Sequence, residues 1–177
     1  MATVRLITLN ARGLNTPMKR RLALADARAQ GGDIVFVQET HFRADSAPTL
    51  SSPHYSTSYV SNFVTSKSRG VAILLARHVP FVYDSHVSDP GGRFLFLKGT
   101  LGLTRCTLVN IYLPNRNQCQ ALRAILTKLS RYSEGIIICG GDFNVPLEPR
   151  LDTSRKSSSI PPCSLRHIRR NTGASQS

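Results

Sequence analysis

The feature that most constrains the fold is an apolar run, residues 136–147, that ends in two glycines, a carboxylate and an amide. It reads Ile-Ile-Ile-Cys-Gly-Gly-Asp-Phe-Asn-Val-Pro-Leu. The β-branched start predicts a buried strand, and the glycines let the backbone turn sharply where it ends. If the chain stays extended there, Asp142 and Asn144 point to one side and Phe143 to the other. This pairing indicates a functional site; a strand followed by an Asx turn is the alternative explanation.

The length and composition of the chain predict one globular domain. Its 177 residues are enough for a real core, and 41% of them are hydrophobic. No apolar run is long enough to cross a membrane. The strand pattern begins within the first ten residues, which leaves no room for a secretory signal. We therefore expect an intracellular protein, nuclear or cytoplasmic, that is neither secreted nor membrane-bound.

The chain is strongly basic. It has 23 Lys and Arg residues against 10 Asp and Glu, a net charge of +13. Such a charge favours a polyanionic partner, with nucleic acid first, although a merely basic protein is the alternative. Trp is absent and aromatic residues make up 7% of the chain, so no base-stacking platform is evident. Binding to nucleic acid should therefore depend on salt and only weakly on sequence.

The first 40 residues follow a strand–helix–strand pattern. The first predicted strand covers Val4 to Leu9, and the second covers Ile34 to Val37. In open α/β sheets, ligands collect outside the carboxyl ends of the strands. Asn10 and Glu39, which follow these two strands, are therefore candidates for one site. A turn residue and a solvated strand end are the respective alternatives.

Two helices are predicted. Thr16 caps the first, with Pro17 at its first position, and its expected buried stripe is Met18, Leu22, Ala25 and Ala29. Asn117 is expected to cap the second, whose stripe is Leu122, Ile125, Leu126 and Leu129. Between the helices, short strands with turns predict a β meander: Tyr55–Phe63, Gly70–Arg77, Phe81–Val87, Arg93–Thr100 and Thr104–Tyr112.

The character of the chain changes after Leu147. Residues 148–177 contain prolines, serines and scattered basic residues, with no strand-like run. This composition favours mostly irregular structure. We therefore divide the chain into a folded domain, residues 1–147, and an irregular basic tail, residues 148–177.

Five motifs follow one another along the chain, and together they are far more specific than any one of them. They are LNARGL at 9–14, QETH at 38–41, GVAIL at 70–74, NIYLPN at 110–115 and GGDFNVPL at 140–147. In this order they resemble the endonuclease/exonuclease/phosphatase superfamily. The closest likeness is to the apurinic-type endonuclease domain of retrotransposons without long terminal repeats. The resemblance runs from about Val4 to Leu147.

The resemblance implies a four-layer α/β sandwich that hydrolyses phosphodiesters with a divalent metal ion, Mg²⁺ or alternatively Mn²⁺. In the retrotransposon branch it implies nicking of DNA. Glu39 would be the metal ligand, and Asn10 would help to place both metal and phosphate in catalysis. The chemistry agrees, because Mg²⁺ prefers oxygen ligands and is typically held by one or two carboxylates.

The resemblance also implies catalytic roles at two further strand ends. Tyr112 would contact the phosphate, Asp142 would align and deprotonate the attacking water, and Asn144 would hold a phosphate oxygen. Arg12 and Asn115, which lie inside the first and fourth motifs, would contact the substrate. In-line attack does need a base near the water and a metal to take up charge.

The chain departs from the family after Asp142. Family members continue with several strands and a Ser-Asp-His-type ending, whereas His167 here has no adjacent acid and Asp152 lies in a polar turn context. We therefore expect a truncated or diverged domain that lacks part of its second sheet and leaves an uncovered edge. The leading hypothesis is an impaired DNA endonuclease. The alternatives are a catalytically dead fragment that binds nucleic acid and a phosphatase of the same superfamily.

Overall fold

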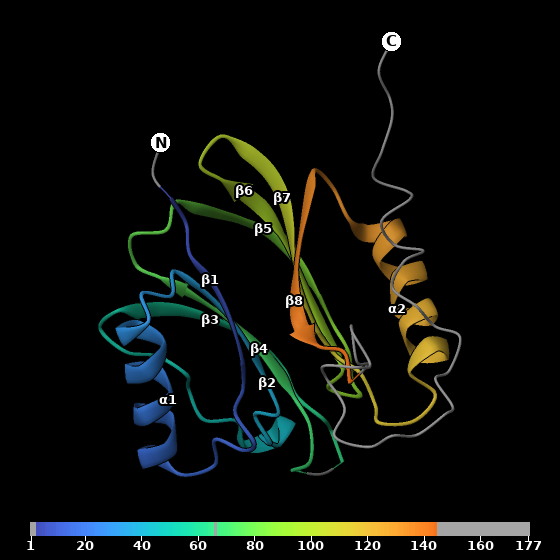
Figure 1. The fold of residues 1–177 in the computed structure, drawn as a ribbon, viewed down its shortest axis with the longest axis horizontal. Helices are drawn as coiled ribbons and strands as arrows, with labels where there is room; N and C mark the ends of the chain where they lie inside the picture. Colours follow the sequence, from blue (N-terminus) through green and yellow to red (C-terminus); the bar gives the residue numbers. More distant parts are fainter. Residues whose placement is uncertain (1–2, 66, 145–177) are drawn as a thin grey trace, which may run out of the picture.

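The computed structural model describes residues 3–65 and 67–144, which form four layers in the order helix, sheet, sheet, helix (Figure 1). Helix α1 (Pro17–Ala29) covers the first sheet and α2 (Gln118–Tyr132) covers the second. The first sheet contains β1 (Leu6–Asn10), β2 (Ile34–Gln38), β3 (Tyr55–Ser61) and β4 (Val71–Ala76). The second contains β5 (Phe81–Ser88), β6 (Phe94–Leu101), β7 (Thr104–Tyr112) and β8 (Ile136–Asp142). One short 3-10 turn, η1, spans Ala44–Ser46. The predicted α/β sandwich is confirmed.

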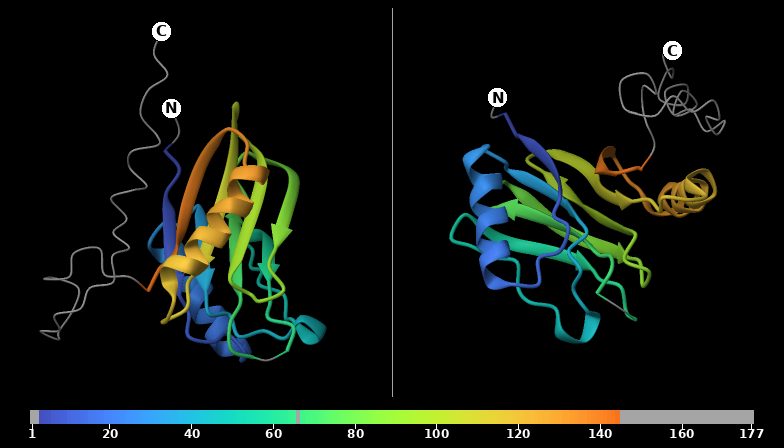
Figure 2. Two further views of the ribbon diagram at one scale, coloured as in Figure 1. Left: turned by 90° about the vertical axis from the view of Figure 1, so that its right-hand side faces the viewer. Right: turned by 60° about the horizontal axis from the view of Figure 1, so that its bottom comes forward.

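Each sheet contains one pair of parallel strands joined by a helix. The strand orders are β1-β2-β4-β3 and β5-β6-β7-β8. Strands β1 and β2 are parallel and joined by α1, and β7 and β8 are parallel and joined by α2. All other pairs are antiparallel. The predicted meander is therefore only partly right, because the β3–β4 pair belongs to the first sheet and β5 to β7 to the second (Figure 2).

Strands β2 and β4, in the middle of the first sheet, are apolar on both faces because that sheet is covered on both sides. In β2, Ile34 and Phe36 point into the core between the sheets, whereas Val35 and Val37 point toward α1. Successive side chains of a strand alternate between its faces. A continuous apolar run is the expected pattern for a strand covered twice.

The predicted cap of α1 is confirmed, but its predicted buried stripe is wrong. Thr16 accepts a hydrogen bond from the Lys19 N–H. The four residues of the expected stripe are exposed: Met18 (64%), Leu22 (59%), Ala25 and Ala29. The buried residues are Leu24 and Ala27. Alanines and leucines occur so often in this helix that two stripes satisfy helical spacing, and packing against the first sheet selects the other one.

Helix α2 follows its predicted pattern closely. Its buried residues are Leu122, Ile125 and Leu129, and Leu126 packs against the same core. Asn117 occupies the N-cap position, but its φ of 56° is left-handed and its side chain makes no capping hydrogen bond. The predicted N-cap position is therefore confirmed, whereas the capping hydrogen bond expected from the Asn117 side chain is absent from the described residues. Neither helix of the described segments is long and apolar enough to span a bilayer.

Strand β8 is an edge strand, contrary to the expectation that residues 136–142 form a buried strand. Ile136 and Ile137 are 59% and 48% exposed. Within residues 3–65 and 67–144, β8 pairs only with β7. A strand that lacks a neighbour on one side loses part of its cover, whatever its composition. The second sheet thus ends at β8 in the described segments, with the uncovered edge expected for a sheet lacking some of its strands.

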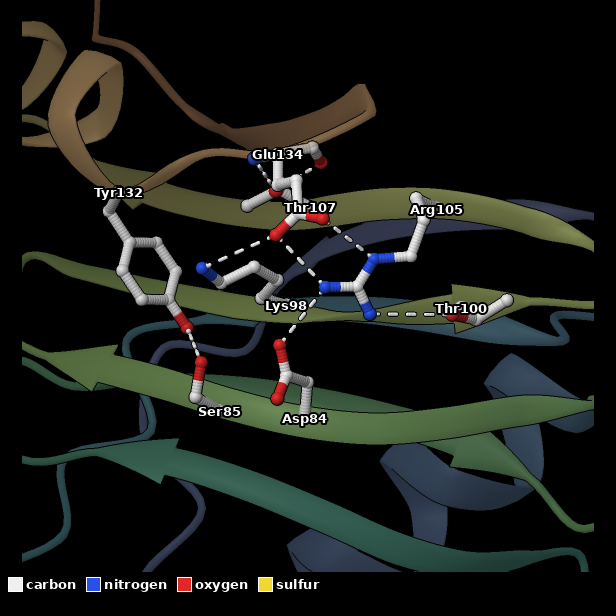
Figure 3. Close-up of polar contacts among 8 residues, drawn as sticks. All are labelled: Asp84, Ser85, Lys98, Thr100, Arg105, Thr107, Tyr132 and Glu134. Atoms are coloured by element: carbon white, nitrogen blue, oxygen red, sulfur yellow. Dashed lines mark hydrogen bonds and ion pairs between the residues drawn. The ribbon is translucent and has the colours of Figure 1, made fainter.

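A polar cluster fastens the connection between α2 and β8 to the second sheet (Figure 3). Arg105 of β7 donates to both carboxylate oxygens of Glu134, at 3.0 and 2.9 Å, and to Asp84 of β5 at 3.1 Å. The Thr107 hydroxyl donates to the Glu134 carbonyl at 2.9 Å. Two-pronged pairs of this kind fix orientation as well as distance. The cluster therefore sets where β8 begins, and Asp142 lies at the other end of that strand.

Candidate active site

The strand ends of the two sheets meet at Asn10. Its side-chain Nδ2 donates to Glu39 Oε1 at 2.9 Å and to Asp142 Oδ2 at 2.9 Å. Asn10 ends β1, Glu39 follows β2, and Asp142 ends β8 in the other sheet. The expected convergence of these residues is confirmed, since one amide group joins carboxylates from both sheets.

The backbone around these side chains adopts unusual conformations. Among the described residues, five that are not glycine have positive φ, and four of them lie here: Arg12, Glu39, His41 and Asn144. Backbone hydrogen bonds hold them, including Gly13 N–H to the Glu39 carbonyl at 2.7 Å. Left-handed conformations of such residues cost on the order of 1–3 kcal/mol each and cluster at functional sites. These backbone conformations therefore lower the stability of the fold, and they orient the side chains of the cluster.

The chain turns directly after Asp142 and does not stay extended. The Asn144 N–H donates to Asp142 Oδ1 at 3.0 Å, which is an Asx turn, and Asn144 has a φ of 48°. Its side-chain Nδ2 donates to the Leu113 carbonyl at 2.7 Å. The Asx turn and the functional site were alternatives on the sequence, yet here the turn orients the carboxylate that faces Asn10. Within the described segments, only one of the two Asn144 amide hydrogens is donated.

Tyr112 completes the cluster from β7. It lies opposite Asp142 in the register of the parallel pair. Burial, followed by a hydrogen bond with the Glu39 carboxylate, raises the pKa of the Tyr112 hydroxyl above its ordinary value. The hydroxyl therefore keeps its proton at neutral pH and acts as a donor.

The two expected substrate contacts lie at the rim of the cluster. The Arg12 side chain is exposed, and the Arg12 N–H donates to Asn10 Oδ1 at 3.2 Å. Asn115 is exposed in the loop between β7 and α2. Its carbonyl accepts from Gln118 Nε2 at 2.9 Å, and the same nitrogen donates to the Asn144 carbonyl at 3.2 Å.

Two residues of this cluster were not identified from the sequence. His41 Nε2 lies 3.5 Å from Glu39 Oε2. Its position two residues after Glu39, at the same strand end, was an available signal. Gln118 ties the Asn115 loop to the turn at Asn144, but a glutamine at the start of a helix carries no signal for such a role. His167 and Asp152 lie outside the described residues.

The donor groups suit a hard divalent cation. Glu39 and Asp142 supply carboxylate oxygens on either side of the Asn10 amide. Mg²⁺ is usually bound by one or two carboxylates and keeps several waters. No group of three or more His, Cys, Asp or Glu side chains in the described segments forms a closed metal cage. Oxygen donors of this kind suit Mg²⁺.

The fold of this chain is similar to those of several solved structures. TDP2 from D. rerio, complexed with a single-strand DNA product, has a TM-score of 0.61 and 18% identity over 81% of this chain and 61% of that one. The AP endonuclease LMAP from Leishmania major has a TM-score of 0.62 and 19% identity, covering 81% and 56%. An AP endonuclease from Archaeoglobus fulgidus has a TM-score of 0.60 and 19% identity, covering 83% and 60%. The chain spans about three fifths of the length of these proteins.

The family assignment rests on a longer match than these folds alone. Residues 7–166 match the model of the Endonuclease/Exonuclease/phosphatase family. That range contains both helices, every strand apart from Leu6 at the start of β1, and every residue of the cluster around Asn10. The chain belongs to the endonuclease/exonuclease/phosphatase family.

Proposed function

We propose that this chain carries the core of a divalent-metal-dependent phosphodiesterase site that nicks DNA, in the manner of a retrotransposon endonuclease. The observation that carries the proposal is the Asn10 amide, which holds the Glu39 and Asp142 carboxylates together from two sheets. Two carboxylates that accept hydrogen bonds from the same amide nitrogen lie close enough to repel each other. A divalent cation would relieve that repulsion.

Glu39 and Asn10 are the residues that would hold Mg²⁺, with Mn²⁺ as the alternative. The bound ion supplies positive charge for the phosphate oxygens as negative charge develops on them. Asp142 would act as the general base for the attacking water. Each of its oxygens accepts one hydrogen bond, from Asn10 and from the Asn144 N–H, and each keeps a second lone pair for the water.

Tyr112 would contact the phosphate by turning its hydroxyl hydrogen away from the Glu39 carboxylate, and Asn144 would donate a hydrogen bond to a phosphate oxygen. The raised pKa of Tyr112 keeps its proton in place for that role. Asn144 has one amide hydrogen beyond the one given to Leu113. Arg12 and Asn115, exposed at the rim, would contact the strand on either side of the cleaved bond.

Charge and similarity together favour DNA as the substrate. The net charge of +13 suits a polyanion better than a small phosphate ester. One similar structure holds a single-strand DNA product, and two others are AP endonucleases. The proposed assignment to the retrotransposon branch rests on the residues of the five sequence motifs.

A second candidate function, binding of nucleic acid without cleavage, is favoured by one observation. The only histidine after Asp142 is His167, and it has no acid beside it. A site that lacks an Asp–His pair loses a transition-state stabiliser but keeps its basic surface.

Nicking of supercoiled plasmid with Mg²⁺, beside DNA binding in EDTA, tests the proposal. We expect slow nicking that needs Mg²⁺ and disappears in Asp142→Ala, while Asp142→Ala still binds DNA. Asp45→Ala, an exposed carboxylate in η1, is the matched control and should nick normally. Binding without any nicking would select the second candidate. Phosphate release from a monoester without DNA binding would select the phosphatase.

A further inference from the structure

Two arginines beside the site, Arg69 and Arg93, form no ion pair within the described segments. The Arg69 guanidinium carbon lies 4.5 Å from the centroid of the Phe63 ring, and that of Arg93 lies 5.4 Å from the centroid of the Tyr112 ring. Both side chains are half-buried. Within the described segments, neither guanidinium has a hydrogen bond or an ion pair, whereas Arg43 and Arg105 pair with carboxylates.

The backbone ties each arginine to a residue of the active-site cluster. The Arg69 carbonyl accepts from the His41 N–H at 2.8 Å, and the Arg93 carbonyl accepts from the Tyr112 N–H at 2.7 Å. His41 contacts Glu39, and Tyr112 lies opposite Asp142. The two guanidiniums are therefore carried by backbone that is continuous with the site.

The same backbone brings the two arginines toward each other. Gly70 and Gly92, their chain neighbours, are joined by a hydrogen bond of 3.2 Å from the Gly70 N–H to the Gly92 carbonyl. A Cβ at Gly92, whose φ is +66°, would lie only 3.1 Å from the Gly70 nitrogen. Burial, followed by the charge of Arg69, lowers the pKa of Arg93 below its ordinary value.

Two half-buried charges of the same sign are unfavourable unless an anion lies between them. Asp89 accepts a hydrogen bond from the Arg93 backbone N–H at 2.9 Å, but its charge affects the pKa of Arg93 less than burial and the charge of Arg69 do. A guanidinium presents a planar fork of donors that matches phosphate oxygens. Stacking on an aromatic ring keeps that fork in one orientation.

We propose that Arg69 and Arg93 together form a second anion site, which binds a backbone phosphate of the DNA strand next to the one that is cleaved. The inference rests on the proposed function and deepens it. Arg93 lies over the Tyr112 ring, whose hydroxyl faces Glu39. The ring therefore separates this guanidinium from the metal-binding carboxylates, so it reaches a neighbouring phosphate.

The test is the salt dependence of DNA binding by the full 177-residue chain in EDTA. The double variant Arg69→Gln/Arg93→Gln should bind duplex DNA more weakly. Its slope of log K against log salt should be shallower by about 0.9, the contribution of one neutralised phosphate. The control Arg123→Gln/Arg131→Gln removes two equal charges from exposed positions of α2 and should keep the wild-type slope.

Each outcome gives a decision. A double variant that matches the control overturns the second site while leaving the proposed function intact. No DNA binding by wild type overturns both. If the double variant does not fold, Arg69→Gln alone replaces it, because the Arg69 guanidinium has no hydrogen bond or ion pair to lose within the described segments, and an unchanged slope then counts against the site.

Inorganic phosphate at constant ionic strength distinguishes a DNA phosphate from a free one. We expect phosphate to weaken DNA binding by wild type and to have no effect on the double variant. Phosphate binding that requires both arginines, together with equal DNA affinity of wild type and variant, would assign the site to free phosphate and overturn the DNA assignment.

Discussion

Gln38 Nε2 donates a hydrogen bond of 2.8 Å to Asn110 Oδ1 across the buried interface between the two sheets. Gln38 is 1% exposed and Asn110 is completely buried. The Asn110 amide also donates to the carbonyls of Val37 and Ala72, at 2.9 and 2.8 Å. These hydrogen bonds, the Asn110 network, join β7 to β2 and β4. Because Gln38 directly precedes Glu39, and Asn110 is two residues before Tyr112, the Asn110 network sets how the two halves of the site face each other.

The first prediction concerns the Asn110 network. Asn110→Leu should destabilise the fold by about 3 kcal/mol or more, because it removes three buried hydrogen bonds, one from Gln38 and two to backbone carbonyls, and each buried group that loses its partner costs about 1–3 kcal/mol. Urea unfolding measures the loss. The double variant Gln38→Leu/Asn110→Leu should lose less than the sum of the single variants, because it removes both amides of the pair. Additive losses would show that the two amides stabilise the fold independently.

A second prediction concerns the metal site. Asn10→Asp replaces the amide between Glu39 and Asp142 with a third carboxylate. In EDTA it should lower the melting temperature, by about 2–4 °C for each kcal/mol of repulsion. Mg²⁺ should raise the melting temperature of this variant more than that of wild type. Asn15→Asp, an exposed control, should respond to Mg²⁺ as wild type does. An equal Mg²⁺ response in all three proteins would place the metal elsewhere.

A third prediction concerns acid stability. Hydrogen bonds from Arg105 lower the pKa of the Glu134 carboxyl below its ordinary value. A group whose folded pKa is lowered stabilises the fold above its unfolded pKa, and this contribution is lost as the pH falls through the folded pKa. Glu134→Gln should therefore melt below wild type at neutral pH. The difference should shrink as the pH falls below about 4.3, the ordinary pKa of a glutamate. A difference that does not change with pH would attribute the effect to packing.

The strands, the helices and the meeting of strand ends could be predicted because each rests on a local pattern. The apolar runs at 34–37 and 136–139 predicted strands, and both are present. Their burial could not be predicted in the same way. Burial depends on neighbours, and β8 has one neighbouring strand in the described segments whereas β2 has two. The predicted buried stripe of α1 is wrong for a related reason, since only packing against the facing sheet decides which helical face is buried.

The long-range polar contacts could not be predicted from the sequence. Gln38 and Asn110 were read only as parts of motifs, because nothing local shows that an amide will lie between two sheets. Arg69 and Arg93 precede apolar strands and resemble ordinary flanking charges. Their proximity follows from the hydrogen bond between Gly70 and Gly92. Such pairings become visible only when the two sheets are stacked.

The last prediction concerns the rate of nicking by this chain alone. Loss of a single transition-state stabiliser typically costs on the order of 10²–10³ in rate. After Asp142 the sequence has no Asp–His pair, and within the described segments the only histidine near the carboxylates is His41, 3.5 Å from Glu39. We therefore expect nicking at least about 10²-fold slower than that of the Archaeoglobus fulgidus AP endonuclease on the same abasic duplex. His41→Gln and His167→Gln identify any substitute donor. A comparable rate in wild type that falls in one of these variants would show that this histidine supplies the missing function, and the prediction of impaired activity would then be wrong.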